Sequence, residues 1–380
     1  MDGISMHLFP RDLNAVYMGH KLDSSLKQYI DISVEERRAI VSGQMDDRIS
    51  YWTKLHSPPA EILPLFPFAR VKSPPIPKTY RNVESLIDIG NHLSGQIKRA
   101  SQSLRITPFY FYLAALQTLF NRLLDVEDIC IGVADANRSE SSLQTIGFFL
   151  KLLSLRFNVQ KNVKFSDLVA KTAQHCRTAQ ANMRVPFDGI LDKANVVREP
   201  INTPIFQVAM NYRQGNFSKI PLGGRNLEFK DGIDAQSPYD LAFSITPNND
   251  TTYVQIVARE DLYTREGTDT LLSAYMALLH DASGDVSKCL GSINLYDQVG
   301  IDKALSLGYG DVVDYDWPST LTEKVDETIK RYPHDVAVKD GTSQLIYGEV
   351  AAKVNGLASI IQSQVRPGSP VAVLCEPTAS

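Results

Sequence analysis

The spacing of apolar and polar residues predicts helices at the start of the chain. Apolar residues recur at helical intervals over residues 4–17, and Pro10 should kink this helix or mark its boundary. A second helix should begin at Ser33 with a capping-box pattern and could continue toward Trp52. Seven prolines then fall within residues 58–77, a density that excludes regular structure. This stretch should therefore be an extended crossing between structural units.

The strongest patterns lie in the middle of the chain. Thr107 and Pro108 form a typical helix start, and the following residues 109–124 are apolar nearly all round, which predicts a deeply buried helix. Residues 165–183 and 268–280 also have helical spacing. The predicted strands are residues 129–133, 146–157, 206–212, 239–245 and 252–258. This order of elements predicts a mixed α/β (α+β) fold without an internal repeat.

The pattern changes after residue 290. Residues 309–318 are polar and rich in turn-forming residues, as expected of a linker. The elements predicted beyond it are helices at residues 321–331 and 349–362 and strands at residues 336–338, 345–347 and 371–374. Because this portion has only about 60 residues, it should not bury a good core by itself.

Composition and charge exclude several classes of protein. The 39 Lys and Arg residues against 43 Asp and Glu give a net charge of −4, which leaves no broad basic surface for nucleic acid. No apolar run reaches the roughly 18 residues of a membrane span, and the first residues lack the pattern of a signal peptide. The four cysteines are far apart and form no Cys-x-x-Cys pair. We therefore expect a cytoplasmic protein that binds neither nucleic acid nor membrane.

Generic motifs reveal no complete active site. The seven histidines include no close metal-ligand pair, and neither a Gly-x-Ser-x-Gly elbow nor a phosphate-binding loop occurs. One local feature is unusual, because Asp2 and Gly3 directly precede a predicted helix. Asp2 can be interpreted as a cap of that helix or as part of a functional motif.

Several segments within residues 1–290 carry motifs in a fixed order. They are Asp2 with Gly3 and residues 128–138, 146–156, 185–188, 204–208 and 237–241. Together they resemble the condensation domains of nonribosomal peptide synthetases, and most of all the domain at the junction of fungal polyketide–nonribosomal peptide hybrid synthetases. Asp2 and Gly3 look like the end of the family's His-His-x-x-x-Asp-Gly motif, whose two histidines would lie upstream of Met1.

The end of the chain resembles the start of an adenylation domain. Residues 316–321 are similar to the linker into that domain, and residues 345–350 to its Leu-Thr-Tyr-x-Glu-Leu motif. The ATP-binding loop of that family would lie beyond Ser380, so adenylation by this chain is not expected. The resemblance implies a remnant of the donor-side lobe and a crossing at 1–75, an acceptor-side lobe at 76–300, a linker at 301–320 and a truncated adenylation domain at 321–380.

The resemblance also implies a fold and an activity. The fold would be an incomplete chloramphenicol-acetyltransferase-like condensation lobe followed by the adenylation stub. The activity would be amide-bond formation between a carrier-bound acyl thioester and a carrier-bound aminoacyl thioester in secondary metabolism. No cofactor would bind directly, because both substrates arrive on phosphopantetheine arms. The partners would be carrier-protein domains or other synthetase modules.

In the family, the second motif histidine positions or deprotonates the acceptor amine, a role that needs a group of near-neutral pKa within hydrogen-bond reach. Since both histidines are missing here, we expect this synthetase fragment to be inactive as written. Asp2 would organise the catalytic loop, with Arg156 as its expected bidentate partner. Asn211 would line the channel between the lobes, and Asp240 belongs to a strand motif of the family.

Two positions depart from the family pattern. Lys151 stands where the family has Asn, which puts a cation near the expected channel, and Ser154 stands where it has Pro. Two other interpretations of the chain remain open. It could be a non-catalytic module that binds carrier domains, or a stand-alone acyltransferase with a different base, for which His7 and His175 are candidates.

Overall fold

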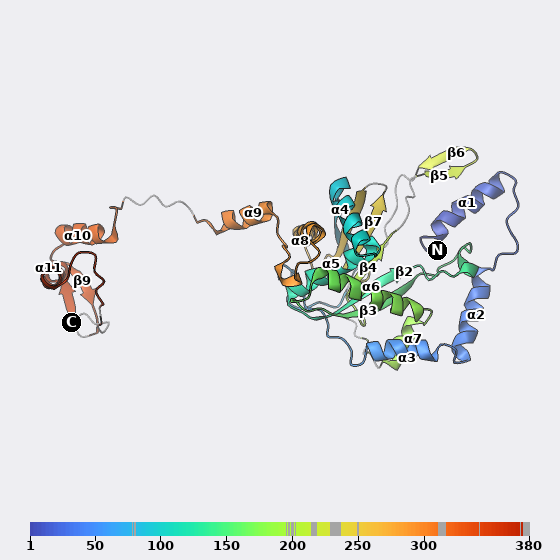
Figure 1. Cartoon of the computed structure of the whole chain (residues 1–380), viewed down its shortest axis with the longest axis horizontal. Helices are drawn as coiled ribbons and strands as arrows, with labels where there is room; N and C mark the ends of the chain where they lie inside the picture. Colours follow the sequence, from blue (N-terminus) through green and yellow to red (C-terminus); the bar gives the residue numbers. More distant parts are fainter. Residues whose placement is uncertain are drawn as a thin grey trace. The chain divides into compact units, whose positions relative to one another are not determined.

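A six-stranded sheet is the central element of the first of two compact units, Met1–Leu305 and Ser306–Ser380, in this computed structural model (Figure 1). The structure describes residues 1–77, 79, 81–194, 196, 198, 201, 203–213, 219–228, 237–248, 251–310, 317–341, 343–372 and 374. The boundary between the units falls within α9 (Gln298–Gly308), a helix in the region where the sequence predicted a linker.

The sheet combines parallel and antiparallel strands. Its order is β1 (Asn82–Asp88), β8 (Thr251–Arg259), β7 (Leu241–Asn248), β4 (Val208–Tyr212), β2 (Asp128–Asp135) and β3 (Lys151–Asn158). β4 runs parallel to both of its neighbours, with Val208 opposite Ile131 of β2 and Leu241 of β7. The other pairs are antiparallel. The carboxyl ends of β2, β4 and β7 therefore meet at one edge of the sheet.

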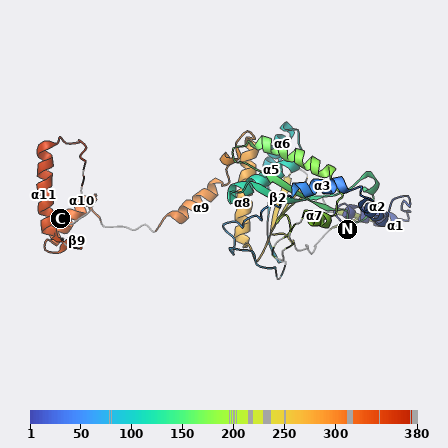
Figure 2. The ribbon, with the colours of Figure 1, turned by 90° about the horizontal axis from the view of Figure 1, so that it is seen from below.

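Four helices cover one face of the sheet. They are α4 (Gly90–Ser103), α5 (Pro108–Leu124), α6 (Phe165–Ala181) and α8 (Arg265–Gly284), which also pack against one another (Figures 1 and 2). As predicted, α5 begins at Pro108 and is deeply buried, because 12 of its 17 residues lie in the core. Asp125 ends α5 in the left-handed region, at φ 57°.

Three helices precede the sheet in the chain, and the prediction differs from the structure in this region. α1 (Ser5–Tyr17) continues through Pro10, which removes only one backbone hydrogen bond and is not a boundary. The single predicted helix from Ser33 is instead two, α2 (Tyr29–Val41) and α3 (Asp46–Leu55). The chain turns between them at Gly43, whose φ of +76° suits a residue without a side chain.

The proline-rich crossing has no helix or strand at its described residues, as predicted. It nevertheless contributes to the core, since Leu63 and Phe66 are buried. The ring of Phe66 lies 5.3 Å from that of Phe120 of α5. Shorter elements complete the unit: η1 (Glu140–Ser142), α7 (Phe187–Lys193), the hairpin β5 (Lys219–Leu222) and β6 (Arg225–Glu228), and η2 (Leu290–Ser292).

The second unit contains most of the elements that the sequence predicted for it. They are α10 (Leu321–Arg331), β9 (Val336–Lys339), β10 (Gln344–Ile346) and α11 (Tyr347–Gln364). The strand predicted at 371–374 is not formed at Val371, Ala372 or Leu374, and residue 373 lies outside the described residues. None of the described helices in either unit is both long and apolar enough to cross a membrane.

Candidate functional site

Asp2 lies at the centre of a buried hydrogen-bond network that joins the start of the chain to the segment before β3. Its carboxylate accepts hydrogen bonds from the amide and the hydroxyl of Ser5, both at 2.9 Å, and from the amide of Phe149 at 2.9 Å. The guanidinium of Arg138 donates to both carboxylate oxygens, at 2.7 and 2.9 Å. Burial alone would raise the pKa of Asp2, but these hydrogen bonds outweigh it and hold the pKa below its usual value.

Arg138 is the ion-pair partner of Asp2, so the predicted pairing with Arg156 is wrong. The Arg138 side chain is only 2% exposed and also donates to the Ser142 and Thr145 carbonyls. Its guanidinium lies 4.2 Å from the centre of the Phe149 ring, in a cation–π contact. Arg138 ends the segment 128–138 that resembled a family motif, and this was the signal that could have identified it.

Arg156 has a different partner because it lies within β3, opposite Cys130 of β2. Its guanidinium forms a bidentate pair with Asp128, with distances of 2.9 and 2.7 Å. It also donates to the carbonyls of Leu55 and Pro58, at 3.3 and 2.5 Å. Arg156 thus ties the end of α3 to the edge strand of the sheet.

A pocket of about 840 Å³ opens beside Asp2. It lies where the carboxyl ends of β2 and β4 approach the amino end of α5. Asp2, Gly3, Asn211 and His7 all line it. Other lining residues include Thr107, Tyr110, Asp135, Leu153, Gln180 and Arg213.

Asp240 and Lys151 are not among the residues that line this pocket. Asp240 is buried at the start of β7 and pairs with Arg259 at 2.9 Å, and Arg259 also pairs with Asp261 at 2.7 Å. Burial raises the pKa of Asp240 more than Arg259 lowers it. The ammonium of Lys151, expected as a cation near the channel, instead pairs with Glu36 of α2 at 2.8 Å. Both groups therefore hold elements of the fold together.

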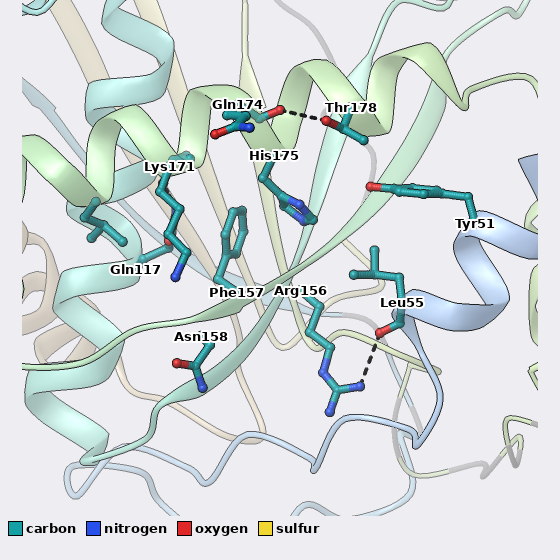
Figure 3. A pocket seen from close by; sticks show the side chains of 12 residues that line it. Tyr51, Leu55, Gln117, Arg156, Phe157, Asn158, Lys171, Gln174, His175 and Thr178 are labelled. Carbon is teal, nitrogen blue, oxygen red and sulfur yellow. Dashed lines mark hydrogen bonds between the residues drawn. The ribbon is translucent and has the colours of Figure 1, made fainter.

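A second pocket, of about 430 Å³, lies at the open edge of β3 and contains Arg156 and His175 (Figure 3). Figure 3 shows Tyr51 of α3 and His175 of α6 pointing into this space from opposite sides. Burial, and then the charge of Lys171, lowers the pKa of His175. The two candidate histidines are thus separated, because His7 lines the first pocket and His175 the second.

The described part of the chain offers no group of three His, Cys, Asp or Glu side chains arranged to hold a metal ion. What the first pocket does offer is a large, mixed apolar and polar space with an ionised, fully hydrogen-bonded carboxylate at its wall. Since Asp2 is occupied by Arg138, Ser5 and Phe149, it can fix the position of the N-terminal residues but is poorly suited to accept a proton.

Comparisons with known proteins agree with the motifs. The condensation domain family model matches residues 1–303. The chain is 39% identical over 381 residues to the hybrid PKS-NRPS synthetase apdA of Emericella nidulans, and 33% identical over 380 residues to the hybrid PKS-NRPS synthetase iliA of a Neonectria species. Each match covers 100% of this chain but only 10% and 9% of the relative, so the chain spans about a tenth of their length.

Two solved structures show the fold. The condensation domain from Monacolin K polyketide synthase MokA matches with a TM-score of 0.69 and 25% identity, over 76% of this chain and 68% of that one. A holo four-domain nonribosomal peptide synthetase bound to AMP and glycine matches with a TM-score of 0.72 and 13% identity, over 96% of this chain and 29% of that one. The predicted mixed α/β, chloramphenicol-acetyltransferase-like fold is confirmed.

Proposed function

The chain belongs to the condensation domain family, and from that premise we propose that it is the acceptor side of an amide-forming domain in a polyketide–nonribosomal peptide synthetase. The observation that carries the proposal is the pocket of about 840 Å³ in which Asp2, Gly3 and Asn211 lie together. Residues from two motifs that are far apart in sequence, Asp2 with Gly3 and Asn211, border one space large enough for a small acyl or aminoacyl group.

The reaction in this proposal is aminolysis of a thioester. The amine nitrogen of the acceptor attacks the thioester carbonyl of the donor, so that a C–N bond forms and the C–S bond breaks. The nitrogen loses a proton and the departing thiolate gains one. Both substrates would be carried on phosphopantetheine arms, with carrier-protein domains as the partners.

In this reaction Asp2 is an organising residue rather than the base. Its carboxylate is already neutralised by Arg138 and filled with hydrogen bonds, and its pKa lies below the usual value. A proton acceptor at neutral pH needs a higher pKa and a free lone pair. We therefore propose that residues 1–380 alone do not catalyse amide formation, because their match to the histidine motif contains only Asp2 and Gly3.

We propose further that the second unit is the beginning of an adenylation domain. The segment 345–350, which resembles an adenylation motif, forms the end of β10 and the start of α11. The match to the four-domain synthetase structure covers 96% of this chain, whereas the condensation family model matches only to residue 303. Both observations support a unit of different origin after α9.

Ligand binding and turnover test the proposal separately. The probe is alanyl-aminopantetheine, an acceptor analogue in which an amide replaces the thioester, titrated into residues 1–380 by calorimetry or NMR. Saturable binding is expected. It should weaken at least about tenfold in Gly3→Trp, because Gly3 lines the pocket and a side chain there has open space ahead of it.

The matched control is Gly284→Trp at the end of α8, where an added side chain also meets open space. It should bind the probe like the unsubstituted chain. Absence of binding by the unsubstituted chain would contradict the assignment of the pocket. Amide formation above the buffer rate from acyl- and alanyl-pantetheine thioesters would instead overturn the proposed inactivity, and His7→Gln would then test whether a different base acts.

A further inference from the structure

A second carboxylate borders the pocket of Asp2, and the hydrogen bonds that hold it come from uncharged groups. Asp135 is the last residue of β2. One of its oxygens accepts the amide N–H of Asn137 at 2.8 Å, and the other accepts the side-chain amide of Gln180 at 2.9 Å. Within the described residues, no Lys or Arg forms an ion pair with Asp135. The two hydrogen bonds hold the carboxylate in place without cancelling its charge.

Among the described residues, Asp2 and Asp135 are the two carboxylates that line the pocket, and they differ in what they can still bind. Asp2 is 7% exposed and receives hydrogen bonds from Arg138, Ser5 and Phe149. A carboxylate has about four acceptor positions, and Asp135 uses two of them within the protein. Asp135 therefore retains acceptor capacity for a ligand, whereas Asp2 does not.

The position of Asp135 suits a ligand that reaches the motif residues. It stands three residues before Arg138, so their Cα atoms lie within about 11 Å even if the chain is fully extended. Arg138 in turn contacts Asp2 at 2.7 Å. Because Asp135 lines the same pocket as Asp2 and Gly3, a ligand group held by Asp135 would share that space with the residues at the start of the chain.

The proposed acceptor supplies a cation that fits this carboxylate. An aminoacyl group carries an α-amino group with a pKa near 8, so it arrives mainly as an ammonium at neutral pH. Bringing that ammonium into a partly apolar pocket costs free energy unless a carboxylate accompanies it. A hydrogen bond between two charged groups is also stronger than one between neutral groups.

We propose that Asp135 binds the α-ammonium of the acceptor and positions it in the pocket, an inference that rests on the proposed function. Asp135 then selects acceptors that carry a free amine over acyl groups of the same size that lack one. Its role is binding and orientation. The hydrogen bonds from Gln180 and the Asn137 amide fix the position of the carboxylate at the wall of the pocket.

The test compares two probes that differ only in the amine. Alanyl-aminopantetheine has the ammonium, and propionyl-aminopantetheine lacks it. The unsubstituted chain should bind the first about tenfold more tightly than the second. Asp135→Asn, which keeps the shape of the side chain and removes its charge, should abolish this preference and leave binding of the propionyl probe unchanged. Asp326→Asn in α10, an exposed carboxylate, is the control and should retain the preference.

The outcomes separate this inference from the proposed function. If neither probe binds the unsubstituted chain, the proposed function itself fails. If both probes bind the unsubstituted chain equally, or if Asp135→Asn weakens both by the same factor, the role of Asp135 is wrong while the pocket assignment stands. The comparison of the two probes on the unsubstituted chain needs no variant, so a folding defect in Asp135→Asn cannot hide the absence of a preference.

Discussion

The two units of the chain use their apolar residues in opposite ways. In the first unit, α5 buries 12 of its 17 residues, and the core extends from Trp52 to Leu295. In the second, neither α10 nor α11 has a buried residue among those described, and Val354 and Leu357 of α11 are more than half exposed. Yet α10 has a complete capping box between Thr320 and Glu323. Local signals can thus specify a helix whose apolar face is left without a core.

This contrast predicts that replacing a large apolar side chain by alanine lowers the free energy of unfolding much more in the first unit than in the second. Phe111 of α5 is fully buried and lies 4.9 Å from the Phe165 ring, so Phe111→Ala should lower the free energy of unfolding of the first unit by about 3–5 kcal/mol. Leu357→Ala, at an exposed position, should change that of the second by less than about 0.5 kcal/mol. Urea titrations measure both.

The two tryptophans make the measurement specific to each unit. Trp52 is buried in the first unit and Trp317 is exposed in the second, so fluorescence in a Trp317→Phe background reports the first unit alone. A background with Trp52→Phe reports the second. If Leu357→Ala proved as costly as Phe111→Ala, the second unit would have a core of its own and the contrast would be broken.

The sequence predicted the buried elements better than the exposed ones. The apolar pattern of α5 and of the central strands was strong because these elements are covered on most sides. β1 was missed because it is an edge strand in which only Ser85 is buried, so it lacks a clear alternation of apolar and polar residues. The break at Gly43 was missed because a single glycine does not by itself distinguish a turn from a tolerated helical residue.

The site shows a similar division. The family motifs singled out Asp2, Gly3 and Asn211 one by one, and the structure places all three around one pocket. The motifs did not identify the partner of Asp2: Arg138 lies in the loop past the end of β2, whereas Arg156 lies within β3 opposite Cys130. The choice depends on the turn after β2, where Asn137 has a φ of 50° and Arg138 folds back over the following loop. Such a turn leaves no periodic signal in the sequence.

Replacing Arg138 should destabilise the network around Asp2 more than replacing an exposed arginine destabilises the surface around it. Arg138→Ala leaves a buried carboxylate without its cation, a change that costs about 3 kcal/mol in comparable pairs. Because Asp2 is close to the start of the chain, the protein can limit this cost by releasing the N-terminal residues. Amide exchange should therefore accelerate at Met6 and Leu8, whose N–H groups bond to the carbonyls of Asp2 and Ile4.

Arg11→Ala is the matched control for this prediction. Arg11 pairs with Asp12 and donates to the side chain of Gln144 at the surface of α1, where an exposed ion pair contributes about 0–1 kcal/mol. It should leave exchange at Met6 and Leu8 nearly unchanged. Equal exchange rates in the two variants would show that Arg138 does not hold the N-terminal segment, and Asp2 would then lose its organising role.

The smallest predicted effect concerns His56, a buried titratable group outside the first pocket. It is 1% exposed, its Nε2 lies 2.9 Å from the Ser154 hydroxyl, and its Nδ1 is buried without a hydrogen-bond partner among the described residues. Burial, and then the charge of Arg156, lowers the pKa of His56 to about 4. Since an unfolded histidine has a pKa of about 6.5, the unfolded state binds the proton first as the pH falls.

The free energy of unfolding of the first unit should therefore decrease as the pH falls from about 6.5 to about 4. Between pH 7 and pH 5, His56 should account for about 2 kcal/mol of this decrease. The lowered pKa of Asp2 reduces stability only below about pH 5, where the unfolded carboxyl, with a pKa of about 3.9, begins to bind protons, so it does not affect the interval between pH 7 and pH 5. Urea titrations at both pH values should show a difference that is about 2 kcal/mol smaller in His56→Gln. The same loss in both proteins would mean that other groups, such as His175, carry the pH dependence.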